Sequence, residues 1–234
     1  MAHEPTDSLS ALTELGRIKL GETDLEGVLD RVAELAQKTL PGASEVSITL
    51  VRDRGAYTAA YTGNRALALD EWQYRLDGGP CLQAAADNAT VSVPDTAAET
   101  RWATWAGRAT EAGMGSVLSV GLPILDTVSG ALNIYGAEPH AFDEEAVALA
   151  HTFVRYAAVA LANAHLYDTT MTLAQHMQAA MESRAVIEQA KGIIMGERRC
   201  SPDEAFAILS KVSQDANRKL RDVAQALVAR TQRG

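Results

Sequence analysis

The sequence predicts an α+β fold in which helices cover an antiparallel sheet, followed by a long helix and a small helical module. Two pairs of segments with alternating apolar and polar residues indicate the sheet. Helical patterns stand before the first pair and after the second, so the strands are grouped rather than interleaved one by one with helices. From His140 to Lys191 the chain contains neither glycine nor proline, which indicates the long helix.

The N-terminal part begins with two predicted helices, over residues 8–20 and 24–40. Residues 45–51 alternate apolar and polar side chains, as a half-buried strand does. We expect residues 56–62 to pair with this strand across a turn at Asp53-Arg54-Gly55.

A second strand pair is predicted over residues 116–125 and 130–135, joined by Asp126-Thr127-Val128-Ser129. The stretch between the two pairs, residues 76–115, shows no regular period and is expected to cross the sheet as irregular chain. Asp143 and the two glutamates after it then start the long helix, because acidic residues favour the positive end of the helix dipole.

The long helix needs a partner. If continuous from Asp143, it would span on the order of 70 Å at about 1.5 Å per residue, which is too long for one small domain to bury. Alternating steps of four and three residues from Leu166 onwards form a short, imperfect coiled-coil seam. The side chains expected to line this dimer stalk are Leu166, Leu173, Met177, Ala180 and Ile187. A break near residues 167–170 is the alternative, because Asp and Thr lower helix propensity.

The C-terminal part contains three helical patterns with basic outer faces. The long helix is expected to end near Arg198-Arg199, where cations meet the negative end of its dipole. Ser201-Pro202-Asp203-Glu204 combines a serine N-cap, a proline at the first helical position and the glutamate of a capping box. The apolar face of the second helix consists of Ala205, Phe206, Leu209 and Val212. A third apolar pattern runs from Leu220 to Val228.

Length and charge fit a regulator with a nucleic-acid-binding end. The 234 residues carry a net charge of −9, but residues 184–234 hold ten Lys/Arg and six Asp/Glu, net +4, and the preceding residues are net −13. A basic module on an acidic body suits phosphate contact at one end, although a merely solvated helical surface would carry the same charges. Cys81 and Cys200 suggest neither a disulfide framework nor a zinc site. No secretion signal or membrane-spanning run is expected, so the predicted location is the cytoplasm.

Three motifs near the C-terminus occur in the order of a known family. They are Arg184-x-x-Ile187-x-Gln189-Ala190-Lys191-Gly192-Ile193-Ile194-Met195, then Ala205-Phe206-x-x-Leu209, then Asn217-x-Lys219-Leu220-x-Asp222-Val223-Ala224. This part of the chain closely resembles the ANTAR domain. The resemblance implies an RNA-binding output module of antitermination regulators, which binds paired stem-loops in a nascent leader transcript and stops a terminator hairpin from forming.

Basic and amide side chains of this module are the predicted RNA contacts. They are Arg184, Gln189, Lys191, Arg198, Arg199, Asn217, Arg218, Lys219 and Arg221. Lysine and arginine would hold phosphates, while Gln189 and Asn217 would read base edges in a hairpin loop. The alternatives are that Gln189 packs in the stalk and that Asn217 caps the last helix. Phe206 is expected in the core, so no aromatic surface for base stacking is predicted.

Short fragments in the first part of the chain also occur in a family order. They include Gly79-Pro80-Cys81, Val93-Pro94-Asp95, Gly113-Met114-Gly115-Ser116, Gly130-Ala131-Leu132-Asn133-Ile134-Tyr135 and Phe142. Residues 8–165 resemble a GAF domain of the actinobacterial type. The resemblance implies a sensory or dimerising module with a small-molecule pocket between the sheet and the crossing segment. The pattern of the cyclic-nucleotide-binding subgroup is missing, so the ligand and any cofactor stay unknown.

Six side chains are the candidate pocket residues: Trp72, Cys81, Trp102, Trp105, Ser119 and Asn133. Core packing is the alternative for Trp102 and Trp105, which lie three residues apart, and Cys81 suits a buried structural role. No residue spacing typical of a metal site or a catalytic set is found, so neither a metal nor an enzyme activity is expected.

These patterns predict a homodimeric regulator. Residues 8–165 form a GAF-like sensor that binds a small ligand or mediates dimerisation, and residues 166–234 form the coiled-coil stalk and an ANTAR-like RNA-binding domain. The expected partner is an RNA with tandem stem-loops, and no membrane contact is expected. A DNA-binding regulator with the same sensor is the alternative, because it would use the same basic helices.

Overall fold

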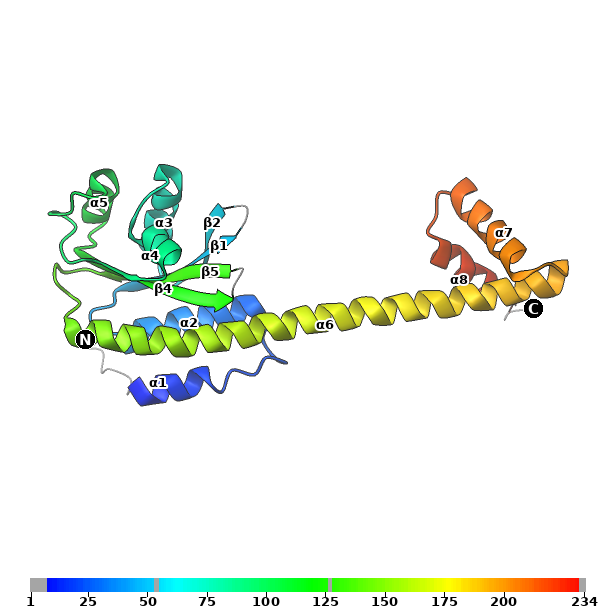
Figure 1. The fold of residues 1–234 in the computed structure, drawn as a ribbon, viewed down its shortest axis with the longest axis horizontal. Helices are drawn as coiled ribbons and strands as arrows, with labels where there is room; N and C mark the ends of the chain where they lie inside the picture. Colours follow the sequence, from blue (N-terminus) through cyan, green and yellow to red (C-terminus); the bar gives the residue numbers. More distant parts are fainter. Residues whose placement is uncertain (1–7, 53–54, 126–127, 232–234) are drawn as a thin grey trace. The chain divides into compact units, whose positions relative to one another are not determined.

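A computed structural model describes residues 8–52, 55–125 and 128–231 of the chain (Figure 1). The chain divides into two compact units, one up to Asp168 and one from Thr169 onwards. Asp53-Arg54 and Asp126-Thr127, which belong to two predicted turns, lie outside the described residues.

The first unit holds the predicted antiparallel sheet, with five strands. Across the sheet they are β2 (Gly55–Tyr61), β1 (Glu45–Arg52), β5 (Val128–Gly136), β4 (Ser116–Leu125) and β3 (Thr90–Val93). The sequence predicts the first four of these strands and not β3. Since β3 has only four residues, its alternation is too short to be recognised as a strand pattern.

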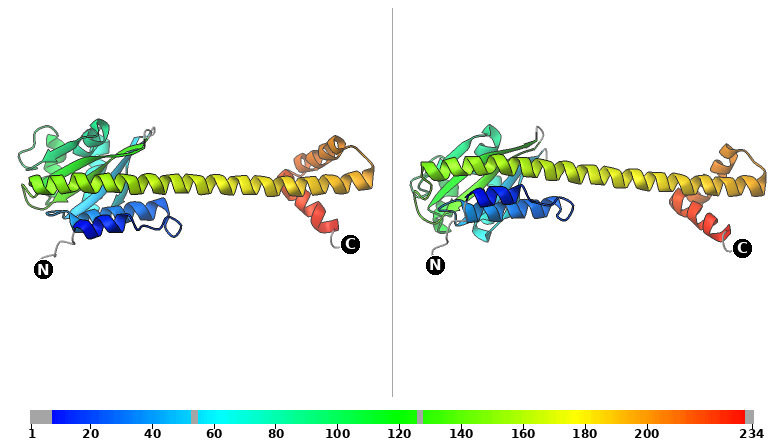
Figure 2. Two further views of the ribbon diagram at one scale, coloured as in Figure 1. Left: turned by 60° about the horizontal axis from the view of Figure 1, so that its bottom comes forward. Right: turned by 90° about the horizontal axis from the view of Figure 1, so that it is seen from below.

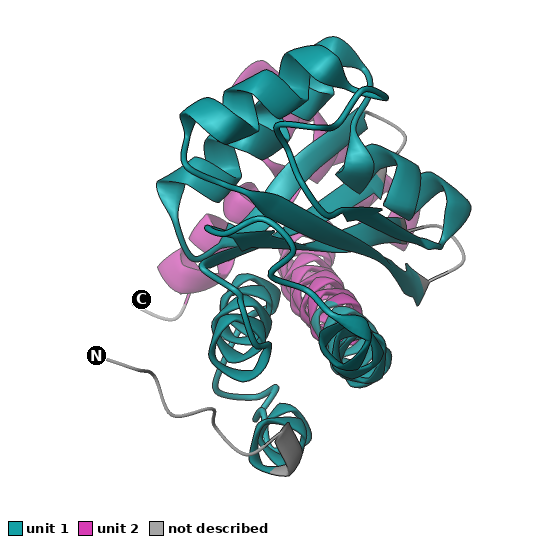
Figure 3. Cartoon of the chain, turned by 90° about the vertical axis from the view of Figure 1, so that its left-hand side faces the viewer, with its two compact units in different colours: residues 1–168 teal, residues 169–234 magenta. Residues whose placement is uncertain are grey.

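The sheet has two unlike faces, each covered by its own group of helices (Figures 1 and 3). Val46, Ile48, Leu132 and Ile134 point to an apolar core. That core is shared with α1 (Ser8–Leu15), α2 (Leu25–Thr39) and the first part of α6 (Glu144–Arg198). The other face is covered by α3 (Asn64–Leu76), α4 (Pro80–Asp87) and α5 (Ala103–Glu111). Successive strand residues point to opposite faces, so the polar residues between these apolar ones lie under α3 and α4.

The expectation of an irregular segment over residues 76–115 is wrong, because this stretch contains α4, β3 and α5. The two helices have only eight and nine residues, which is too few for a helical period to be distinguished in the sequence. Asn88 ends α4 in a left-handed conformation, with φ +46°. The first helix, α1, is also shorter than predicted and ends at Leu15.

Helix α6 runs unbroken from Glu144 to Arg198, so the alternative of a break near residues 167–170 is not observed. Asp143 caps its start, since the Ala146 N–H donates to Asp143 Oδ1 at 2.8 Å. By length and composition alone, α6 is long and apolar enough to cross a membrane, although no membrane-spanning run was predicted from the sequence. In the first unit, Phe153 and Leu161 of this helix are buried against the sheet.

In the second unit, α7 (Pro202–Asp215) and α8 (Leu220–Thr231) pack beside the end of α6 (Figure 2). Their core consists of Ala190, Ile194, Ala205, Leu209, Val223 and Ala224. The predicted capping box is present: Ser201 Oγ accepts from the Glu204 N–H at 3.3 Å, and Glu204 Oε2 accepts from the Ser201 N–H at 2.8 Å. The predicted three-helix module is therefore confirmed.

Candidate functional sites

The covered polar face of the sheet is the first candidate site. Ser47, Asn133 and Ser119 stand opposite one another on β1, β5 and β4, so they form a polar row across three strands. All three are fully buried. Asn133 Nδ2 donates to Ser47 Oγ at 3.1 Å. The row arises because the alternation that turns Leu132 and Ile134 towards α6 turns Asn133 towards α3.

Asp70 of α3 is fully buried and connects this row by hydrogen bonds to Tyr135 of β5 and Thr58 of β2. Its Oδ1 accepts from Tyr135 OH at 2.5 Å and from Asn133 Nδ2 at 3.4 Å, and its Oδ2 accepts from Thr58 Oγ1 at 3.0 Å. A carboxylate from a helix and hydrogen-bond donors from β2 and β5 thus form one buried network. Such a network stabilises a single arrangement when its members are satisfied.

Asp70 is not among the site residues predicted from the sequence. A signal was present, because Ala66, Leu69, Asp70 and Gln73 follow helical spacing and are all buried. Two polar residues on an apolar helical face indicate a buried polar network. The helix itself was not identified from the sequence, so these two positions could not be recognised as buried.

Burial sets the ionisation of this network. It raises the pKa of Asp70 to about 6, since the carboxylate loses its hydration, while hydrogen bonds from Ser47, Tyr135 and Thr58 oppose the shift. Burial and the negative charge of Asp70 also raise the pKa of the Cys81 thiol. Cys81 therefore stays a thiol at neutral pH, which fits a structural role better than that of a nucleophile.

Two oxygens of the polar row have no hydrogen-bond partner among the described residues, Ser119 Oγ and Asn133 Oδ1. Because Ser119 and Asn133 are cross-strand neighbours, both oxygens lie on the same side of the sheet. A buried polar group without a partner costs about 1–3 kcal/mol. Helix α4 lies close above β4, since a Cβ added at Gly121 would come within 2.8 Å of the Ala84 carbonyl oxygen.

The structure separates the six candidate pocket residues into two groups. Cys81, Trp105, Ser119 and Asn133 are buried, whereas Trp72 and Trp102 are partly exposed. Trp105 Nε1 donates to the Leu69 carbonyl oxygen at 3.1 Å, which is the core packing given above as the alternative. Arginine side chains stack on Trp72 and Trp102 at 4.8 and 4.5 Å from the ring centres.

None of the six residues lines any of three cavities on the described part of the chain, whose volumes are about 810, 680 and 370 Å³. Ser119 and Asn133 of the polar face are both fully buried. The described residues also contain no group of three or more His, Cys, Asp or Glu side chains placed to hold a metal ion.

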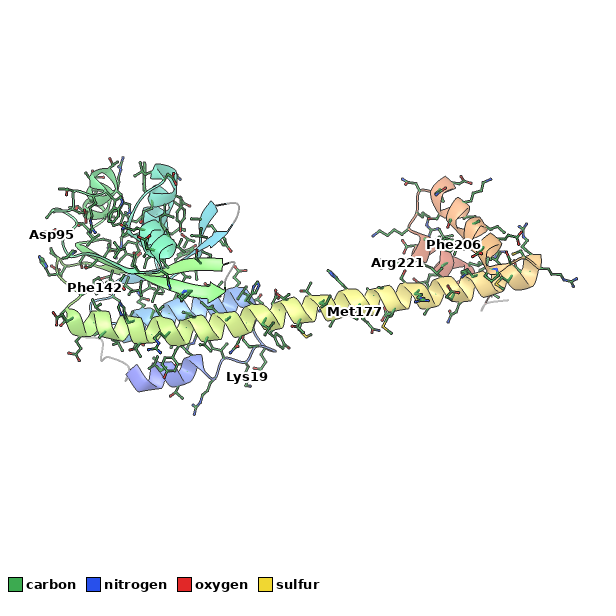
Figure 4. The ribbon with its side chains drawn as sticks, in the orientation of Figure 1. Lys19, Asp95, Phe142, Met177, Phe206 and Arg221 are labelled. Carbon is green, nitrogen blue, oxygen red and sulfur yellow. The ribbon has the colours of Figure 1, made fainter. Side chains whose placement is uncertain are left out.

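The second candidate site is the basic surface of the second unit. Eight of the nine predicted RNA contacts are exposed, and Lys191 is half-buried beside Glu188, with 3.0 Å between Nζ and Oε1. Arg199 directly follows α6 in a left-handed conformation, with φ +51°. Arg218 and Lys219 occupy the turn between α7 and α8, and Arg221 lies in the first turn of α8 (Figure 4).

Asn217 ends α7 and does not cap α8, so the cap alternative is corrected. Its backbone is left-handed, with φ +49°. The Asn217 N–H donates to the Gln214 carbonyl at 3.1 Å, and the Arg218 N–H donates to the Ser213 carbonyl at 3.0 Å. These two bonds are those of a Schellman motif, and they leave the Asn217 side chain exposed.

Phe206 does not lie in the core, contrary to the sequence analysis. It is 44 % exposed, while its neighbours Ala205 and Leu209 are buried. Since successive residues point about 100° apart around a helix, the close packing of α7 at Ala205 leaves Phe206 at the edge of the contact. Phe206 is the only Phe, Tyr or Trp from residue 169 to the end of the sequence, so this unit does present an aromatic surface (Figure 4).

Comparison with protein families assigns both units. Residues 22–162 match the family model of the GAF domain, and residues 175–228 match that of the ANTAR domain. A comparison with curated proteins gives no significant match.

Solved structures similar to this chain support the first assignment at the level of the fold. The phycocyanobilin-bound GAF domain from a cyanobacterial phytochrome shares 19 % identity, with 70 % of this chain and 98 % of that chain covered and a TM-score of 0.53. The reduced form of fRMsr of Staphylococcus aureus shares 18 % identity, with 69 % and 99 % covered and a TM-score of 0.53. At such identities the similarity concerns the fold alone.

Proposed function

We propose that this chain, which belongs to the GAF domain family and carries an ANTAR domain after it, acts as a cytoplasmic homodimer on paired stem-loops. The two domains together give a sensor and an RNA-binding antitermination unit. Each ANTAR domain binds one of two stem-loops in a nascent leader RNA, and a terminator hairpin then cannot form. The observation that carries this proposal is the exposed basic surface within residues 184–221, on a chain whose preceding part is acidic.

Within this surface, arginine and lysine hold phosphates and the amides of Gln189 and Asn217 read base edges. Hairpin loops expose such edges, and specific RNA recognition usually occurs there. Phe206 adds an aromatic side chain on which a loop base stacks. Base stacking on an aromatic side chain contributes about 1–3 kcal/mol per base.

The GAF domain senses a small polar ligand at the face that carries Asn133 and Ser119. A ligand that donates to Asn133 Oδ1 and hydrogen-bonds the Ser119 hydroxyl satisfies two oxygens for which the described part of the chain offers no partner. Such a ligand has to displace α4, which lies close above β4. Strand β5 turns Asn133 to this face and Leu132 to the core shared with α6, so a shift of β5 acts directly on α6. A GAF domain that only dimerises is the alternative, and equal RNA affinity with and without every tested ligand favours it.

Binding to a leader RNA with two tandem stem-loops tests the proposal. We expect tight binding of the intact pair at two chains per RNA, and much weaker binding of a single stem-loop or of a loop-base variant. The measurement is a titration at fixed salt together with the mass of the complex, because salt alone changes such affinities strongly.

Duplex DNA of equal charge is the control for the DNA-binding alternative. Preference for the duplex would support that alternative. Weak binding that does not depend on the loop sequence would show that the basic surface attracts nucleic acid only through its charge.

Two kinds of contact in this surface are separable by their salt dependence. Replacing Arg218 and Arg221 by Ala is expected to lower RNA affinity roughly 30-fold and to reduce the slope of log affinity against log salt by about 1.5, because two phosphate contacts are lost. Phe206→Ala is expected to lower affinity roughly tenfold with an unchanged slope, because stacking releases no counterions. The measurement is a series of RNA titrations at several salt concentrations.

Matched controls exist for both changes. Arg17→Ala with Lys38→Ala removes the same charge from the first unit, and Val212→Ala removes an apolar side chain that is 48 % exposed on α7. Neither control should change affinity more than about twofold. An unchanged salt slope for the double arginine variant would show that Arg218 and Arg221 do not contact RNA phosphates.

A further inference from the structure

Helix α6 has two apolar faces in the first unit. Phe153, Ala157 and Leu161 are buried in the core against the sheet. On the opposite side Tyr156 is 54 % and Val159 61 % exposed. Large apolar side chains that gather on a helix surface indicate a contact site, because soluble proteins seldom expose them together.

A groove runs beside these exposed residues. Its volume is about 370 Å³, and its lining is mostly apolar: Leu15, Ile18 and Leu20 come from the end of α1 and the segment after it, and Tyr156, Val159 and Asn163 come from α6. Helix α1 and the start of α6 lie side by side in both views of Figure 2. Leu15, Ile18 and Leu20 thus form an apolar wall beside the exposed face of α6.

The exposed residues of α6 follow a heptad repeat. Tyr156, Asn163, Thr170 and Met177 are seven residues apart, and a second row three residues later contains Val159, Leu166 and Leu173. Leu166 is 65 % and Leu173 59 % exposed. These are the a and d positions of a coiled coil, and the repeat that begins in the GAF domain is the one that continues through the stalk.

Charge indicates which partner fits this face. From Tyr156 to Met181, Asp168 is the only Asp, Glu, Lys or Arg, although the first 183 residues are net −13. Asp168 falls on the outer side of the repeat, away from both rows. Two identical acidic chains repel each other over most of their surface, and this uncharged strip is where two copies meet without repulsion.

We propose that a second copy of this chain docks along this face in parallel and in register, from Tyr156 to Met177, so that Asn163 of one copy meets Asn163 of the other. The inference rests on the proposed homodimer and extends its interface from the stalk into the sensor domain. A polar Asn at an a position fixes register and orientation in coiled coils, since any other alignment buries its amide against apolar side chains. The part of α6 from Tyr156 to Leu161 is then held between the sheet and the second copy.

Cysteine cross-linking tests this pairing in the full-length chain with Cys200→Ser, which removes the partly exposed thiol and leaves the buried Cys81. Asn163→Cys should form a disulfide-linked dimer under mild oxidation roughly tenfold faster than Asp168→Cys, because only side chains at the seam come within disulfide distance. Tyr156→Glu should weaken the dimer at least roughly tenfold, because it places two carboxylates opposite each other.

The outcomes separate this inference from the proposed homodimer. If the chain is dimeric but Asn163→Cys and Asp168→Cys cross-link equally slowly, the parallel in-register pairing is wrong and the proposed homodimer is still supported. If sedimentation shows a monomer at all concentrations, both the in-register pairing and the proposed homodimer are wrong. Binding of a monomer to lipid vesicles would also overturn the inference and would assign the same face of α6 to a membrane surface.

Discussion

Leu173→Glu combined with Met177→Glu is expected to abolish the homodimer and to lower affinity for the tandem stem-loop RNA roughly 10²–10⁴-fold. Two linked binding units gain this much over one, because the second binding event becomes intramolecular. Both side chains are 59 % exposed in the single chain, so the change leaves the fold of the protomer intact (Figure 4). In a paired helix the new carboxylates would face each other at the seam.

Sedimentation equilibrium and RNA titration measure this effect together. The matched control is Thr172→Glu combined with Gln175→Glu, which adds the same charge to exposed positions of the same helix outside the seam. That control should remain dimeric and bind the tandem RNA as the unchanged protein does. A dimer that survives the Leu173 and Met177 changes would show that the stalk is not the interface.

Asp70→Asn is expected to raise the free energy of unfolding above pH 7 by about 2 kcal/mol. Asp70 has a folded-state pKa of about 6, well above the value of about 3.9 for an unfolded chain. The folded protein therefore binds more protons between these two pH values, and wild-type stability falls as the pH rises from about 4 to about 6. Asn carries no charge, keeps an acceptor for Tyr135 and offers a donor to Thr58, so the variant should lose this dependence.

Urea unfolding between pH 4 and pH 8 measures the difference. Glu71→Gln, at an exposed neighbouring position of α3, is the control and should keep the wild-type profile. Asp70→Ala should lose the pH dependence as well, but should be less stable than Asp70→Asn by about 3 kcal/mol at every pH, because it leaves Tyr135 and Thr58 without their acceptor. A wild-type profile that is flat over this range would contradict the burial of an ionisable Asp70.

Structural features that depend on residues close together in the chain could be predicted from the sequence. The alternation in residues 45–51 identified β1, the absence of Gly and Pro identified α6, and Ser201-Pro202-Asp203-Glu204 identified the start of α7. These signals depend on local backbone geometry, because a capping box or a strand period involves residues close in the chain. The GAF and ANTAR assignments rest on motif order and were likewise available from the sequence.

The positions of single side chains depend on how these elements pack in three dimensions. The tertiary structure brought Asp70 of α3 to Asn133 and Tyr135 of β5, more than sixty residues away, and it set the unpartnered oxygens of Ser119 and Asn133 side by side. It also left Phe206 exposed, although its neighbours in the sequence are buried. Burial is a property of the packed assembly: a local period shows which residues share a face, whereas the fit between elements decides which of them lose water.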